Sequence, residues 1–167
     1  MRIVIAPPVP ALLPAYASLH DPVSALRAAC TDAVGWLGAD APARVRSADD
    51  LGQRVGEHLL GETVRGAGGL LVMANGSACR SEKAPGYLDR RAAQYDDFVF
   101  QALAEGNSRA LADLDLDLAG QLMSKGAGLL RDLADVRVHD VVVDHSDDSY
   151  GVSHWVIRWD CDERSRR

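Results

Sequence analysis

The chain has 167 residues, of which 47% are hydrophobic and 25% charged, so it is long enough for one globular domain and too apolar for extended disorder. The chain has 18 lysines and arginines and 24 aspartates and glutamates, so its net charge is −6. A nucleic-acid partner is therefore not expected. No apolar run reaches the roughly 20 residues that cross a bilayer. Prolines interrupt the apolar N-terminus, so we expect no signal peptide, no membrane partner and a cytoplasmic location.

Strand-like and helix-like patterns alternate along the chain. The runs 2–6 and 70–73 are apolar without polar alternation, as in strands that are buried on both faces of a sheet. Asp21 followed by proline marks a helix start, and Ser47 with Asp50 resembles a capping box. In chain order we expect a strand at 2–6, a proline-rich loop at 7–14, helices at 21–38 and 47–59, a strand at 70–73, helices at 89–103, 108–123 and 126–134, and strands at 136–144 and 150–159.

This order predicts an α/β fold, a three-layer domain with a mixed, mainly parallel central sheet and a C-terminal hairpin. The single domain is expected to span residues 1–160, and the basic residues 161–167 to form a disordered tail. Trp155, Ile157 and Trp159 alternate on the last strand. They would form a core layer or, if exposed, the contact surface of a homo-oligomer.

Ligands in open α/β sheets collect beyond the carboxyl ends of the strands, where the loops 7–16 and 75–87 are expected. The second loop is the densest polar segment of the chain. Arg80 and Lys83 would suit a small anionic molecule, whose orientation the other polar groups would set. The alternative is a solvated loop whose charges pair with one another. The candidate ligand-binding residues are Asn75, Ser77, Arg80, Glu82 and Lys83.

The segment from Asn75 to Asp96 resembles a signature of the class III extradiol ring-cleavage dioxygenases of the LigB type. The match includes Gly76 and the run Arg80-Ser81-Glu82-Lys83-Ala84-Pro85-Gly86-Tyr87, and it is most similar to an alanine-rich actinobacterial branch of uncharacterised proteins. The opening strand with its Leu-Leu-Pro loop and the ending at Tyr150-Gly151-Val152 resemble the same branch. Residues 38–66 are shorter than in that branch and do not align with it.

In active members of this family, two histidines and a carboxylate hold Fe(II). The resemblance puts Val9 at the position of the first iron-binding histidine and Ala78 at that of the acid/base histidine. It assigns no residue to the second histidine ligand or to the carboxylate. Since valine and alanine can neither bind iron nor transfer protons, the resemblance implies a divergent, shortened relative that has lost the iron site. Such a protein would bind a small ligand or a protein partner without a cofactor.

An enzyme with a rearranged site, either a metal-dependent oxygenase or a hydrolase, is the alternative. His145 and His154 would hold a divalent metal such as Fe(II) if they met across the hairpin with Asp144. Histidines scattered on a hairpin more often face solvent. A third interpretation is a subunit whose site is completed by a separate partner.

A nucleophilic site is weakly indicated. Ser77 and Cys79 have no neighbouring histidine to act as a base. Cys79 beside Arg80 would have a lowered pKa if the two side chains interact, although a quiet loop cysteine is favoured. With Cys30 and Cys161 it is too widely spaced for a disulfide scaffold or a structural zinc site.

Overall fold

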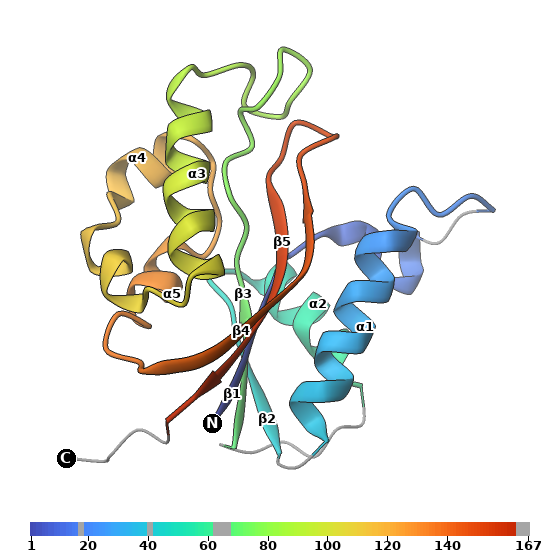
Figure 1. Cartoon of the computed structure of the whole chain (residues 1–167). Coiled ribbons are helices and arrows are strands. Elements are labelled where there is room, and N and C mark those ends of the chain that lie inside the picture. The colour runs from blue at the N-terminus through green and yellow to red at the C-terminus, as the bar shows by residue number, and fades with distance from the viewer. Residues whose placement is uncertain (17–18, 40–41, 62–67, 163–167) are drawn as a thin grey trace.

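A five-stranded mixed sheet runs through the centre of the molecule in the order β2-β3-β1-β5-β4 (Figure 1). The structure is a computed structural model and describes residues 1–16, 19–39, 42–61 and 68–162. Strands β1, β2 and β3 pair in parallel, whereas β5 runs antiparallel to both of its neighbours, β1 and β4. The mixed sheet and the C-terminal hairpin are confirmed. The strands are β1 (Arg2–Ala6), β2 (Ala43–Arg46), β3 (Gly69–Met73), β4 (Val138–Asp147) and β5 (His154–Cys161).

Helices cover both faces of the sheet, which confirms the three layers. Along β1, Ile3 and Ile5 point into one apolar cluster while Val4 and Ala6 point into the other, as the period of a strand dictates. Helices α1 and α2 pack on one face, and α3, α4 and α5 lie on the other (Figure 1). The helices are α1 (Ser24–Gly38), α2 (Asp50–Leu60), α3 (Arg91–Ala104), α4 (Leu116–Gln121) and α5 (Ala127–Arg131), with 3-10 turns at Pro10–Leu12, Pro14–Tyr16 and Ser108–Asp113.

Several element boundaries differ from the predicted ones for local reasons. Helix α2 is capped by Asp49, whose Oδ1 accepts a hydrogen bond from Gly52 N at 2.7 Å, and not by Ser47. The helix expected at 108–123 is divided, because Asp115 caps a new helix by accepting a hydrogen bond from Leu118 N. Strand β4 continues to Asp147, so the hairpin turn lies later than expected.

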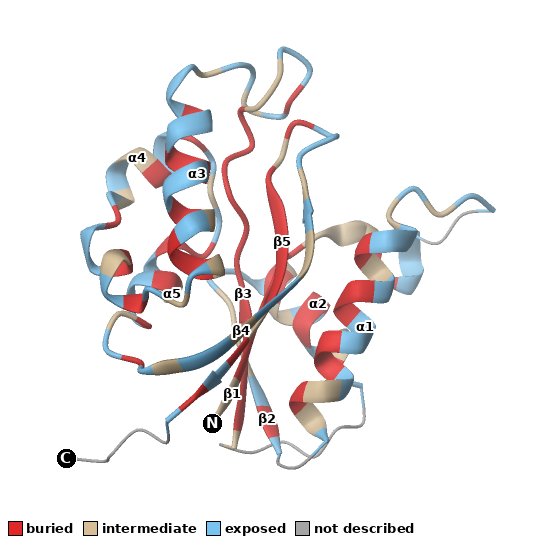
Figure 2. Cartoon of the chain, in the orientation of Figure 1, coloured by how far each residue is buried: buried red, intermediate tan, exposed pale blue. Residues whose placement is uncertain are grey.

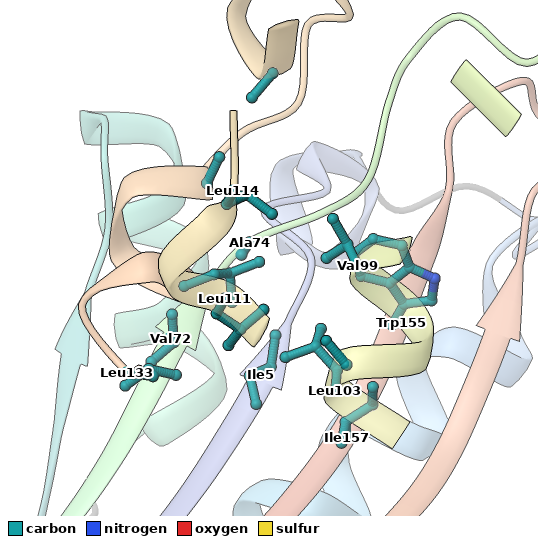
Figure 3. Close-up of a cluster of buried hydrophobic side chains, with 14 of the residues drawn as sticks. Ile5, Val72, Ala74, Val99, Leu103, Leu111, Leu114, Leu133, Trp155 and Ile157 are labelled. Carbon is teal, nitrogen blue, oxygen red and sulfur yellow. The ribbon is translucent and has the colours of Figure 1, made fainter. Parts of the chain in front are cut away.

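The aromatic residues of β5 belong to the core. Trp155, Ile157 and Trp159 are at most 3% exposed, on a strand that is mostly buried (Figure 2). Trp155 and Ile157 lie beside Val99 and Leu103 of α3 (Figure 3). The indole Nε1 of Trp159 donates a hydrogen bond to Leu103 O at 2.8 Å. The core-layer interpretation is therefore confirmed, and these side chains form no exposed strip for contact with a second copy.

The domain extends two residues beyond its expected end at residue 160. Cys161 is the last residue of β5 and is buried. Asp162 lies 2.5 Å from the Nε2 atom of His139. The assignment of both residues to a disordered tail was wrong, and residues 163–167 lie outside the described part of the chain. No helix in the described ranges is long and apolar enough to cross a membrane.

Gly126 provides a test of the packing between β3 and α5. It has a φ of 77°, and a Cβ there would lie 2.5 Å from Met73 O and 2.8 Å from the Cβ of Ala74. We expect Gly126→Ala to destabilise the fold by about 2 kcal/mol or more, since both the conformation and the space require glycine. Gly128→Ala, in open space on α5, should change the free energy of unfolding by at most about 1 kcal/mol, in the stabilising direction. Urea unfolding measures both, and equal effects would contradict this account.

Candidate functional site

The segment after β3 lies against the segment that precedes β5. Gly76 N donates to Ser153 O at 2.8 Å, Ser153 N to Ser77 O at 2.9 Å, and Arg80 N to Gly151 O at 3.0 Å. Residues 74–79 are all buried, so they form an ordered wall of the molecule and not a solvated loop. This backbone pairing brings the predicted ligand loop next to the β4–β5 hairpin.

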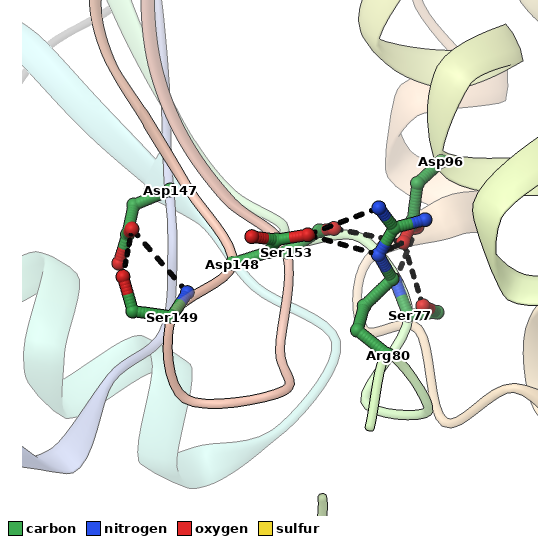
Figure 4. Close-up of polar contacts among 7 residues, drawn as sticks. All are labelled: Ser77, Arg80, Asp96, Asp147, Asp148, Ser149 and Ser153. Atoms are coloured by element: carbon green, nitrogen blue, oxygen red, sulfur yellow. Dashed lines mark hydrogen bonds and ion pairs between the residues drawn. The ribbon is translucent and has the colours of Figure 1, made fainter. Parts of the chain in front are cut away.

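A buried carboxylate connects these segments to α3. Asp96 is 4% exposed. Its Oδ1 accepts a hydrogen bond from Ser77 N at 2.6 Å, and its Oδ2 accepts from the hydroxyls of Ser77 and Ser153, each at 2.7 Å (Figure 4). Sequence reasoning missed Asp96 as a site residue. The available signal was its position on α3, one turn after the buried Ala92, because a carboxylate in a buried stripe requires partners.

Arg80 lies between two carboxylates. Its Nε and Nη2 donate to Asp148 Oδ2 at 3.1 and 3.0 Å, and its Nε lies 3.7 Å from Asp96 Oδ2 (Figure 4). The remaining guanidinium nitrogen, Nη1, is buried and has no hydrogen-bond partner within the described residues. Such an orphaned donor is rare in folded proteins and calls for an explanation.

A cavity of about 280 Å³ lies beside Arg80, between α3 and the β4–β5 hairpin. Four aspartates and one arginine belong to its lining, so we call it the acidic cavity. The aromatic rings on its lining have their centroids 6.2 Å apart. This charge balance disfavours the anionic ligand expected from Arg80 and Lys83. The lining residues are Arg80, Asp96, Asp97, Phe100, Ser146, Asp147, Asp148, Ser153 and Trp155.

Of the five candidate ligand-binding residues, Arg80 alone lines this cavity. Asn75 is buried, and its Oδ1 accepts a hydrogen bond from Lys125 N at 2.9 Å, so it fixes the neighbouring loop. Ser77 is fully buried and donates to Asp96. Glu82 and Lys83 are exposed and do not contribute to the lining.

The two positions of the family histidines do not meet at the acidic cavity. Val9 packs against the apolar cluster on the α1–α2 side of the sheet. Ala78 is buried, with its N–H donating to Leu122 O and its carbonyl accepting from Gly86 N, both at 2.9 Å. Neither residue lines the cavity.

The proposed nucleophiles are enclosed. Burial raises the pKa of the Cys79 thiol above its usual value, which agrees with the favoured interpretation of a quiet cysteine and not with the alternative of a lowered pKa. Its Sγ lies 3.5 Å from Leu122 O. The hydroxyl of Ser77 is inaccessible because its side chain is fully buried.

The metal-binding alternative placed at Asp144, His145 and His154 is not assembled. Both oxygens of Asp144 accept hydrogen bonds from Arg158, at 2.8 and 2.7 Å. His145 and His154 do line one cavity, but with Asp147 and not Asp144. Across the described ranges, no three histidine, cysteine or acidic side chains are grouped so as to hold a metal ion.

Comparisons with known proteins leave the family open. No protein-family model matches the chain. No curated protein matches it either.

The Asp96 network can be tested by unfolding. Asp96→Ala would leave two serine hydroxyls and one N–H without their acceptor, so we expect a loss of about 3 kcal/mol or more in the free energy of unfolding. Asp97→Ala removes an exposed carboxylate from the next position of α3 and should change this free energy by at most about 0.5 kcal/mol. Urea unfolding followed by tryptophan fluorescence compares the two. A small effect of Asp96→Ala would show that the network contributes little.

Proposed function

We propose that this protein binds a small polar molecule in the acidic cavity. The observation that carries the proposal is the buried Nη1 atom of Arg80, a donor without an acceptor on a residue that lines this cavity. Since nearly all buried donors in folded proteins are paired, this nitrogen marks the guanidinium of Arg80 as the part of the lining whose hydrogen bonding is incomplete.

The charges of the cavity limit the chemistry of the ligand. Arg80 is already paired with Asp148 and lies near Asp96, so its positive charge is offset. Asp97 is exposed, and its carboxylate makes no hydrogen bond or ion pair with the rest of the described chain. A ligand with an ammonium group or several hydroxyls would satisfy Asp97, while one acceptor oxygen would reach Arg80. A simple anion would be repelled.

The volume favours a small ligand. At about 280 Å³ the cavity lies just below the range of about 300–1,000 Å³ that is typical of sites for drug-sized molecules. The rings of Phe100 and Trp155 supply an apolar contact beside the carboxylates. An amino alcohol or a small zwitterion has this combination of size and polarity.

We further propose that the chain is a divergent relative of the LigB-type extradiol dioxygenases that has lost the iron site. An iron centre of that kind needs two imidazoles and a carboxylate. The residues at the corresponding positions do not fit Fe(II), because Val9 and Ala78 have no ligand atoms and both are packed among other protein atoms. The support for the relationship is the run from Arg80 to Tyr87.

Ligand binding can be tested with a panel of ammonium-bearing, zwitterionic and carboxylate fragments, observed through the backbone amide signals of the protein. We expect ammonium-bearing or zwitterionic fragments to shift the signals of residues that line the acidic cavity. Asp97→Asn should weaken their affinity by roughly fivefold, since it removes a charged acceptor. Glu82→Gln is the matched control, because it removes one exposed negative charge outside the lining. Binding of carboxylate fragments alone, or equal effects of the two variants, would contradict the proposal.

The loss of the iron site has its own test. We expect anaerobic calorimetric titration with Fe(II) to give no tight, stoichiometric binding, since the imidazoles that the family uses are replaced at Val9 and Ala78. One equivalent of tightly bound Fe(II) would overturn this part of the proposal and leave the acidic cavity to be judged separately.

A further inference from the structure

A second cavity lies between the start of α1 and the β4–β5 hairpin, and its volume is about 300 Å³. Because α1 and α3 cover opposite faces of the sheet, this cavity and the acidic cavity lie on opposite sides of the hairpin. We call it the histidine cavity. Its lining comprises residues 22–26 together with His145, Ser146, Asp147, Ser149, Tyr150 and His154.

The strand register brings its polar side chains to one face. Asp147 pairs with His154, and His145 pairs with Val156 on the neighbouring strand. Directly opposed residues of an antiparallel pair share a face of the sheet, so the two imidazoles and the carboxylate all point to the α1 side. The two imidazoles and the carboxylate therefore face the start of α1.

His154 is a buried polar side chain without a partner. It is 8% exposed and lines the cavity, and its ring makes no hydrogen bond or ion pair with the rest of the described chain. Burial lowers the pKa of this imidazole, with Asp147 acting in the opposite direction. Neither of its unpaired ring nitrogens is a fully buried atom, so both are within reach of a ligand in the cavity.

The opposite wall is the N-terminus of a long helix. Helix α1 has 15 residues, and its first turn contains no acidic residue. Just before it, Asp21 Oδ1 accepts a hydrogen bond from Val23 N at 3.1 Å, and the charge of this carboxylate is offset by its ion pair with Arg27. The first-turn residues Ser24, Ala25 and Leu26 line the cavity. Helix N-termini attract anions, because their first N–H groups lack partners within the helix and the helix dipole is positive there.

We propose that the histidine cavity binds the oxyanion of a small molecule, a phosphate or carboxylate group, between the start of α1 and the imidazoles of His145 and His154. This proposal does not rest on the function proposed for the acidic cavity. Tyr150 OH donates to Pro22 O at 3.2 Å and so links the hairpin turn to the α1 side of the cavity.

Asp147 is the one acidic residue on this lining, and its pKa is lowered, chiefly by the hydrogen bond from the Ser149 hydroxyl, so it stays negatively charged. Its Oδ1 already accepts hydrogen bonds from the N–H and the hydroxyl of Ser149 (Figure 4). The titratable groups facing His154 are Asp147 and His145 from β4 and Tyr150 from the turn, whereas residues 22–26 have none. Because burial lowers the pKa of His154, its ring is neutral near pH 7 in the free protein, and binding of an anion would be accompanied by uptake of a proton on His154. The affinity for an anion should therefore rise as the pH falls.

Calorimetry and imidazole NMR on the full chain, with inorganic phosphate and acetate as probes, test this inference. We expect saturable one-to-one binding that strengthens roughly tenfold from about pH 8 to about pH 6, together with protonation of His154. Stronger binding of phosphate would identify a phosphoryl group, and stronger binding of acetate a carboxylate. His145→Gln should weaken affinity roughly tenfold, whereas His58→Gln, an exposed histidine outside the cavity, should not change it.

A second pair of variants keeps the test independent of folding. Ser24 is exposed in the first turn of α1, so Ser24→Asp should leave the fold intact while placing a negative charge where the oxyanion would bind. We expect Ser24→Asp to weaken phosphate binding more than tenfold and the uncharged Ser24→Asn to weaken it far less. Absence of saturable binding, or equal binding by His145→Gln, Ser24→Asp and the unmodified protein, would overturn the inference.

Discussion

The buried carboxylate of Asp96 is the interaction on which the candidate site depends. It accepts hydrogen bonds from Ser77, in the segment after β3, and from Ser153, just before β5, while its own backbone belongs to α3. A buried charge is costly unless several donors surround it, so these three segments must approach together for the carboxylate to be stable. The same oxygen lies 3.7 Å from Arg80 Nε and helps to set the position of the guanidinium. The geometry of the acidic cavity thus follows from one residue of a helix.

The sequence predicts those parts of the fold in which burial leaves a continuous pattern. Residues 2–6 and 70–73 were recognisable because strands covered on both faces have no polar alternation. Strand β2 was missed for the opposite reason. It is a short edge strand, and Arg44 and Arg46 interrupt its apolar residues, so nothing in its sequence separates it from a loop. A strand that is buried on both faces can be recognised from its own residues. An edge strand such as β2 forms because of its pairing with the neighbouring strand, which its own residues do not reveal.

The site was harder to predict than the fold, because the polarity of a segment does not reveal where its polar groups point. Asn75 and Ser77 were predicted to bind a ligand, but their side chains make hydrogen bonds within the protein. The Asn75 side chain accepts from the backbone of Lys125, and the Ser77 hydroxyl donates to the carboxylate of Asp96. Arg80 alone reaches the acidic cavity. Its partner Asp148 was read as a turn residue, since the sequence places the two 68 positions apart. Distant pairings of this kind depend on the tertiary fold and leave no local trace.

The two proposed sites share a wall, and this gives their chemistry a connection. Ser146 and Asp147 line both the acidic cavity and the histidine cavity. A cation or ammonium group near Asp147 on one side would offset the charge that opposes an anion on the other. The two ligands should therefore favour each other, and the coupling must be equal in both directions. Titration of phosphate with and without a saturating ammonium-bearing fragment measures it. If the phosphate affinity is unchanged, binding in one cavity does not affect binding in the other.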